Sequence, residues 1–161
     1  MDSVLRKKCL KVENIDATLV ALADNMIETM YSASGLGLAA NQVGISSDLF
    51  VIDVGIEKGR RDPVIIINPV ITTSDDEIMA EEGCLSIPEV HAEVKRAQHV
   101  EVKGYDLKGN EVRYEAEGFL ARAFQHEMDH LNGILFWDSL SKVKRDILKR
   151  KFKKKLKELE E

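Results

Sequence analysis

Two stretches of the chain carry apolar residues at the spacing of an amphipathic helix. Asp16 can cap a helix that runs to about Ser32, and the apolar residues of that segment fall on one stripe. Ser141 can cap a second helix over about 141–161. Its apolar side holds Val143, Ile147, Leu148, Phe152, Leu156 and Leu159. The pattern therefore predicts one helix towards each end of the chain.

Between these helices the pattern first becomes that of strands. The β-branched runs at 49–54 and 64–71 predict strands, and alternating apolar and polar residues at 99–106 and 110–118 predict a hairpin. From about residue 119 to residue 131 the period is helical again, and Asn132-Gly133 is a ready stop. These elements predict a third helix directly after the hairpin.

Two glycine-marked segments interrupt the predicted elements. GLGLAANQVG, at 35–44, is rich in glycine and small residues and is expected to be a loop. AEEGCLSIP, at 80–88, is marked by glycine and proline and is expected to be irregular.

Composition indicates one soluble domain that covers residues 1–161. The chain is 44% hydrophobic and 32% charged, and no apolar run approaches the length of a membrane span. The first residues, MDSVLRKKCLKVEN, lack the apolar core of a secretory signal. Only two cysteines are present, which favours a reducing compartment. We therefore expect a cytoplasmic location and no membrane partner.

Charge is divided unevenly along the chain. Residues 142–157 carry ten Lys/Arg and one acid, a local charge of +9, and the last four residues add three glutamates. Since the whole chain has a net charge of -5, residues 1–141 carry -11. The basic helix over about 141–161 is interpreted either as a solvated face or as a contact with ribosomal RNA. No DNA partner is expected.

The stretch QHEMDH, residues 125–130, has the spacing of a metal site. His126 and His130 are four residues apart, so they share one face of a helix, and Glu127 lies between them. Two imidazoles placed in this way can bind one metal ion, and the adjacent carboxylate can move protons. The alternative is an accidental pair of histidines on a core helix.

A catalytic site of this kind usually has a third protein ligand. Downstream, Phe136 stands where the metzincin pattern needs a histidine, and Asp138 is the nearest carboxylate. Upstream, Cys84 lies in EEGCLSIPE, and a thiolate with two imidazoles is a known catalytic ligand set. Cys84 is the better candidate, whereas Cys9 is interpreted as a small buried hydrophobic residue.

Three motifs, in this order and at these separations, resemble those of the peptide deformylase family: GLGLAANQ, EGCLS and QHEMDH. EGCLSIPE is similar to the bacterial type 1 form. The resemblance runs from about residue 3 to the end of the last helix. It implies an α+β fold in which antiparallel β-sheets surround a central helix that carries the HExxH motif. The N-terminal and C-terminal helices predicted above would complete that fold.

The resemblance also implies a reaction, a metal and a set of ligands. The N-formyl group would be removed from newly synthesised polypeptides that begin with formyl-methionine. Cys84, His126 and His130 would hold one metal ion per chain, natively Fe²⁺, with Zn²⁺ or Ni²⁺ as substitutes. Metal-bound hydroxide would attack the formyl carbon, with Glu127 as general acid and base.

Two further groups are expected to serve the reaction directly. The oxyanion that develops on the formyl group needs hydrogen-bond donors aimed at it. The side-chain amide of Gln42 and the backbone N–H of Leu85 are the candidates. The metal would supply the third contact to that oxygen.

Substrate binding is expected on the glycine-rich segment and on the metal-bearing face of the central helix. Leu36 and Gly37 are candidates, Gly37 through its main chain. Phe119, Arg122 and Ala123 share the helical face of the histidines, and Phe119 and Ala123 suit a pocket for the methionine side chain. Arg122 stands where the family often has an aliphatic residue. Either its stem lines the pocket mouth while its guanidinium reaches water or the substrate backbone, or the guanidinium pairs structurally with a carboxylate.

Three other charged residues lie close to the motifs. Glu82 and Arg96 match positions of the resembled family that look structural, and a salt-bridge role is expected for them in preference to chemistry. Asp129 is expected either to support a ligand from behind or to form an ion pair on the helix surface.

Two rival functions use the same residues. A metallopeptidase would cleave internal peptide bonds and would use a carboxylate as third ligand. A metal-stabilised binding module would have no turnover, but such a module would need neither Glu127 nor Gln42. The deformylase is therefore the leading hypothesis.

Overall fold

The structure is a computed structural model that describes residues 1–161, and its α-helices lie where the sequence predicts them. Helix α1 (Ala17–Ser32) begins at Asp16, and helix α3 (Lys142–Glu160) begins at Ser141. Each of these cap side chains accepts a hydrogen bond from a backbone N–H of the first turn. Helix α2 spans Gly118–Leu131. The capping residues thus set the start of both outer helices.

Five strands form one antiparallel sheet in chain order. The strands are β1 (Gly37–Ala39), β2 (Leu49–Asp53), β3 (Pro63–Cys84), β4 (Ile87–Tyr105) and β5 (Glu111–Glu117). Four short 3₁₀ helices complete the chain: η1 (Ser3–Arg6), η2 (Ala40–Val43), η3 (Ile56–Lys58) and η4 (Phe136–Ser139). The expected α+β class is confirmed, with the strands joined in a single sheet.

Both glycine-marked segments are more regular than the sequence pattern indicates. The expectation of a loop over 35–44 is wrong, because β1 and η2 lie within it and β1 pairs with β2. The expectation of an irregular segment over 80–88 is also wrong, since β3 continues to Cys84 and pairs with β4 along its whole second half. In both places a partner strand that is distant in sequence imposes the extended backbone.

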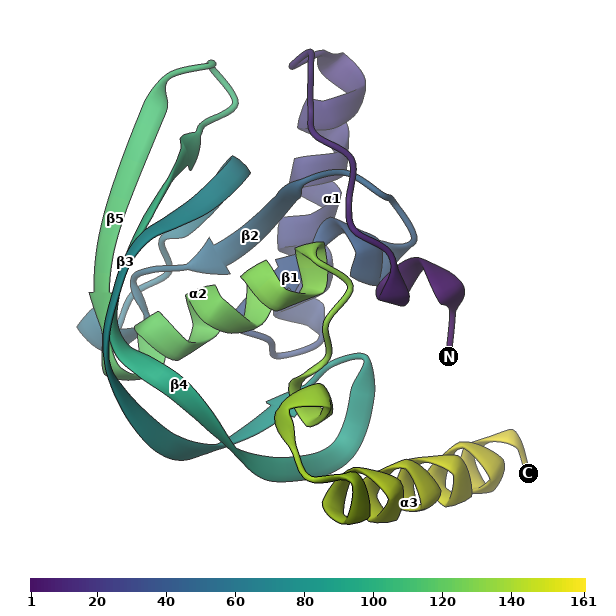
Figure 1. Ribbon diagram of the computed structural model, residues 1–161. Helices are drawn as coiled ribbons and strands as arrows, with labels where there is room; N and C mark the ends of the chain where they lie inside the picture. The colour runs from purple at the N-terminus through teal and green to yellow at the C-terminus, as the bar shows by residue number, and fades with distance from the viewer.

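Helix α2 lies in the hollow of the curved sheet (Figure 1). The register between β3 and β4 shifts at three places, and such irregularities allow long strands to bend. One face of α2 packs against β1, β4 and β5. The core beneath it includes Phe50, Phe124, Val100 and Val102, all fully buried. This packing holds α2 against the strands on several sides and fixes the direction of its polar face.

The two outer helices cover different parts of the sheet (Figure 1). Helix α1 packs on β1 and β2 through Met26 and Met30, which are almost completely buried. Helix α3 packs on β4 and η4 through Phe152, whose ring meets Trp137 edge to face. No helix of the structure is long and apolar enough to cross a membrane.

Candidate metal centre and active site

Cys84, His126 and His130 converge on one point. Their sulfur and nitrogen atoms all lie within 4.8 Å of one another. Cys84 Sγ lies 3.2 Å from His130 Nε2, which lies 3.1 Å from His126 Nε2. The histidines come from successive turns of α2, and the cysteine ends β3. These distances suit a single ion bound by one thiolate and two imidazoles.

The turn that follows Cys84 aims its sulfur at the helix. Strand β3 ends at Cys84, and the chain reverses within two residues to begin β4. The backbone N–H of Ser86 donates to Cys84 Sγ at 3.4 Å. This contact holds the sulfur in the direction of α2.

Glu82 fixes the ring of His126 from behind. Its carboxylate contacts His126 Nδ1 and accepts two hydrogen bonds from Arg96, at 2.7 and 3.0 Å. Arg96 also contacts Asp129, so that one guanidinium joins β3 to α2. A carboxylate on Nδ1 leaves the lone pair of Nε2 directed at the cluster. The expected ion pair of Glu82 with Arg96 is confirmed, and Asp129 belongs to the same network.

Gln42 and Asn41, on η2, approach the cluster from the opposite side. The Gln42 carbonyl oxygen accepts from the Ala39 N–H at 2.9 Å, and this hydrogen bond sets the direction of the amide. Its Nε2 donates to Ser86 Oγ at 3.0 Å and lies 3.8 Å from Cys84 Sγ. The buried Asn41 side chain donates to the backbone carbonyl of His130. The conformation of η2 therefore positions one donor beside the cluster and ties the segment to α2.

Glu127 is buried and faces the glycine-rich segment. Only 4% of the residue is exposed, and its Oε2 has no hydrogen-bond partner in the protein. A Cβ atom at Gly37 would lie 2.8 Å from Glu127 Oε1, so glycine is required for this close approach. A buried carboxylate with one free oxygen can exchange a proton with a bound molecule.

Burial and mutual contact shift the proton affinities of the cluster. Burial raises the pKa of Glu127 to about 7. Burial lowers the pKa of His130 to about 3, whereas for His126 the hydrogen bonds to Cys84 and Glu82 outweigh burial and raise the pKa to about 10. Burial disfavours the Glu82 carboxylate, but its bonds to His126 and Arg96 lower its pKa to about 2. A metal ion held by Cys84, His126 and His130 would take the place of the proton on His126.

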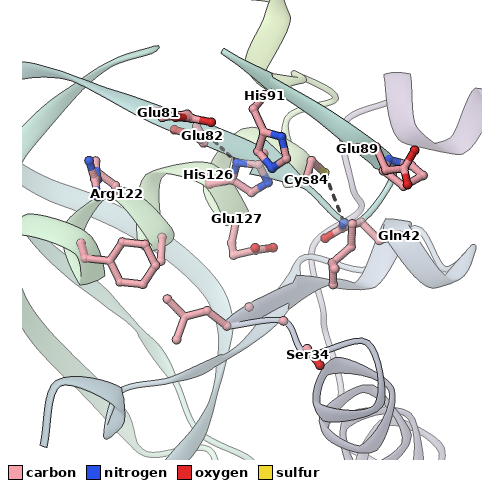
Figure 2. Close-up of a pocket in the computed structure, with 18 residues that line it drawn as sticks. Ser34, Gln42, Glu81, Glu82, Cys84, Glu89, His91, Arg122, His126 and Glu127 are labelled. Atoms are coloured by element: carbon pink, nitrogen blue, oxygen red, sulfur yellow. Dashed lines mark hydrogen bonds and ion pairs between the residues drawn. The ribbon is translucent and has the colours of Figure 1, made fainter. Parts of the chain in front are cut away.

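One cavity of about 600 Å³ opens onto this arrangement (Figure 2). Its walls include every catalytic and substrate-binding residue that the sequence indicates: Leu36, Gly37, Gln42, Leu85, Phe119, Arg122, Ala123 and Glu127. Cys84 and His126 also line it, whereas the fully buried His130 lies behind them. The structure therefore brings the candidate residues of three separate motifs to one pocket.

Other residues reach this pocket that the sequence analysis leaves out. His91 and Glu89 lie on β4 just after the Cys84 turn, and Glu81 lies on β3 just before it. A Cβ atom at Gly83 would lie 2.7 Å from the His91 ring, so this imidazole covers the strand beside Cys84. The pairing of β3 with β4 brings His91, Glu89 and Glu81 to the pocket, and no local sequence pattern predicts this pairing.

Asp138 does not belong to the cluster. It accepts two hydrogen bonds from the Arg6 guanidinium and one from the backbone N–H of Leu135. These contacts tie η1 to η4 and satisfy the carboxylate. The structure therefore does not support the carboxylate-liganded alternative.

The fold and the site together define a class of protein. A cysteine and two histidines that can hold a metal, a buried glutamate beside them and a pocket in front are the parts of a metal-dependent hydrolase.

Comparisons with known proteins define the family within that class. The family model for polypeptide deformylase matches residues 1–146. A peptide deformylase of Syntrophobacter fumaroxidans is 52% identical over 157 residues, which are 98% of this chain and 92% of the relative. The crystal structure of a peptide deformylase from Legionella pneumophila has a TM-score of 0.92 at 44% identity, and covers 99% of this chain and 92% of that one.

A peptide deformylase from Ehrlichia chaffeensis, solved in complex with actinonin, has a TM-score of 0.90 at 42% identity. That match covers 96% of this chain and 92% of the other. This chain belongs to the polypeptide deformylase family. The resemblance inferred from the three motifs is confirmed.

Proposed function

We propose that this chain hydrolyses the N-formyl amide of newly synthesised polypeptides that begin with formyl-methionine. The products are formate and a free amino terminus. The convergence of Cys84, His126 and His130 beside a buried Glu127 is the observation on which this proposal rests. Family membership supports the substrate, and the pocket supports turnover over a binding module without activity.

We propose Fe²⁺ as the native metal, one ion per chain, with Zn²⁺ or Ni²⁺ as substitutes. One thiolate and two imidazoles suit all three ions. When bound, such an ion acts as a Lewis acid that lowers the pKa of water. The contact of Glu82 with Nδ1 supports the proposal, because it orients the His126 ring so that Nε2 can bind the metal.

Glu127 is the proposed proton carrier. It takes the proton of the attacking water and passes it to the leaving nitrogen. Its free Oε2 and its pKa near 7 support both halves of this role, since the group can accept and release a proton near neutral pH.

Gln42 and Leu85 are the proposed donors to the developing oxyanion. The Ala39 N–H holds the Gln42 amide so that its NH₂ faces Cys84, and Leu85 is the residue directly after that ligand. Donors held in place before the reaction stabilise the transition state without reorganising. Both residues line the same pocket as Glu127.

The proposed binding site for the methionine side chain lies along α2. Phe119 and Ala123 offer apolar surface there, and Leu36 and Gly37 line the same pocket. Phe119 is 53% exposed in the structure, so a bound side chain would remove apolar surface from water.

We propose that the basic face of α3 contacts ribosomal RNA near the emerging chain, in the cytoplasm. Lys151, Lys153 and Lys154 are exposed there, and their charge suits phosphate. Deleting the helix would also remove the buried Phe152, so replacing the three lysines with glutamine is the cleaner test. Weaker ribosome binding with unchanged hydrolysis of short peptides is expected. Ribosome binding equal to wild type would refute the contact.

The experiment that tests the function is formate release from formyl-Met-Ala-Ser. It is done without oxygen, with Fe²⁺ or Ni²⁺, and with and without a chelator, because iron and thiolate both oxidise. Rapid, chelator-sensitive release that actinonin inhibits is expected, since the relative from Ehrlichia chaffeensis binds actinonin. No release from protein with one metal per chain would refute the proposal.

A further inference from the structure

Arg122 lines the active-site pocket without a carboxylate partner. The centre of its guanidinium lies 5.5 Å from the centroid of the Phe119 ring, and both residues belong to the pocket wall. It makes no ion pair and no side-chain hydrogen bond in the protein. In Figure 2 it lies at one end of the labelled group, away from Cys84 and Gln42. Its N–H donors are therefore available to a bound molecule.

The other charges of the pocket are mostly committed elsewhere. Glu82 is bound by Arg96 and His126, and Glu89 pairs with Lys155 at 3.1 Å. Glu81 is exposed and unpaired, and it forms no ion pair with Arg122. The carboxylates of Glu81 and Glu127 have no ion pair, and they disfavour an anionic ligand side chain beside them. A neutral group that accepts hydrogen bonds suits Arg122 better.

The position of Arg122 on α2 determines which part of a substrate it can meet. Counting from Phe119, Arg122, Ala123 and His126 follow at three, four and seven residues, so all share one helical face. Phe119 and Ala123 form the proposed wall for the methionine side chain. Arg122 therefore adds a charged hydrogen-bond donor beside the apolar surface of Phe119 and Ala123.

We propose that Arg122 allows the pocket to accept formyl-methionine whose thioether has been oxidised to the sulfoxide. A sulfoxide is neutral, polar and a hydrogen-bond acceptor, and a purely apolar pocket would desolvate it without compensation. The guanidinium compensates with a charge-assisted hydrogen bond. This inference rests on the proposed deformylase function and extends its substrate class.

The reaction itself is unchanged for this substrate. Water adds to the formyl carbon, the carbon–nitrogen bond breaks, and the amine leaves with a proton delivered by Glu127. The sulfoxide oxygen keeps its bond to sulfur throughout. No oxidant or reductant is therefore needed.

The test compares kcat/KM for formyl-Met-Ala-Ser and for the same peptide with methionine sulfoxide. The enzymes are metal-loaded wild type, Arg122→Leu, Arg122→Lys and a control, Arg113→Leu, which removes an exposed arginine of β5 that is outside the pocket. The ratio of sulfoxide to thioether activity is expected to fall about tenfold or more in Arg122→Leu, from a rise in KM for the sulfoxide. In Arg122→Lys this ratio should lie between those of Arg122→Leu and wild type. In Arg113→Leu it should equal the wild-type ratio.

The outcomes separate this inference from the proposed function. If wild type hydrolyses the thioether peptide but has the same ratio as Arg122→Leu, the role of Arg122 is refuted and the deformylase stands. If wild type hydrolyses neither peptide, the proposed function itself fails. Metal content and the far-UV circular dichroism spectrum show whether each variant is folded, independently of its activity on either peptide.

Discussion

The carboxylate of Glu82 contacts His126 Nδ1 on one side and the Arg96 guanidinium on the other. It thereby fixes the ring that presents Nε2 to the cluster, although Glu82 itself is not a ligand. Partners of this kind typically change metal affinity 10- to 100-fold. The ion pair of Glu82 with Arg96, interpreted from the sequence as structural, therefore also orients a candidate metal ligand.

Glu82→Gln should therefore weaken metal binding by about 10- to 100-fold. The amide keeps the shape of the side chain but removes the charge that holds the Nδ1 proton. The apparent dissociation constant for Zn²⁺, measured by competition with a chelator, checks this. Glu81→Gln is the matched control, because Glu81 is adjacent in sequence, is exposed and forms no hydrogen bond or ion pair with His126. Equal affinity in the two variants would contradict the prediction.

Cys84→Ser should lose most of its bound metal on dialysis against a chelator. A neutral hydroxyl binds ions such as Zn²⁺ and Fe²⁺ more weakly than a thiolate does. Metal per chain, measured by elemental analysis, is the readout. Cys9→Ala is the control, since Cys9 is buried and burial raises the pKa of its thiol to about 11. Unchanged metal in Cys84→Ser would mean that the third ligand is another residue.

Local signals account for the parts of this structure that the sequence predicts. Asp16 and Ser141 cap their helices, and the spacing of His126 and His130 places both rings on one face. The short strand β1 has no such signal. Its extended backbone depends on pairing with β2, more than ten residues away.

The same limit applies to the second half of β3. The segment TTSDDEIMAEE is acidic and lacks strong β-propensity, and it is extended because β4 pairs with it. That pairing also brings His91 and Glu89 to the pocket. Their place in the site could not be inferred without the register of two long strands.

Glu127→Gln should retain the metal and lose turnover by roughly 10²- to 10⁴-fold. The amide fills the same space but cannot accept the proton of water. Formate release and metal content are measured on the same sample, so that loss of metal cannot imitate loss of the proton carrier. Near wild-type kcat in a metal-loaded variant would show that another group moves the proton.

Gly37→Ala should also reduce kcat with the metal retained. The added Cβ would lie 2.8 Å from Glu127 Oε1 and 3.0 Å from the carboxyl carbon, so the carboxylate must move. A displacement of this size in a proton carrier costs on the order of 10²-fold in rate. Gly35→Ala is the control in the same segment, because its Cβ would lie 2.7 Å from the end of the Leu85 side chain, which is 41% exposed and can move, and 3.4 Å from the backbone oxygen of Met30, but would not approach Glu127. Equal activity in the two variants would argue against the close approach as the cause.

Asp53 predicts a pH dependence of stability away from the active site. The carboxylate is 4% exposed and accepts hydrogen bonds from the Tyr31 hydroxyl at 2.7 Å and from the N–H groups of Gly55 and Asp62. Burial alone would raise its pKa, but these hydrogen bonds outweigh burial and lower the pKa below its ordinary value of 3.8. The unfolded chain therefore binds this proton more readily than the folded protein does.

The contribution of Asp53 is consequently complete above about pH 4 and is lost as the pH falls towards its lower folded-state pKa. Asp53→Asn should lower the free energy of unfolding at pH 7 by about 1–3 kcal/mol, because one buried acceptor is weakened. The difference from wild type should shrink below pH 4. Urea titrations from pH 7 to pH 3 at equal metal content measure this, with the exposed Asp24→Asn on α1 as control. A difference that stays constant down to pH 3 would show that the charge of Asp53 does not stabilise the fold.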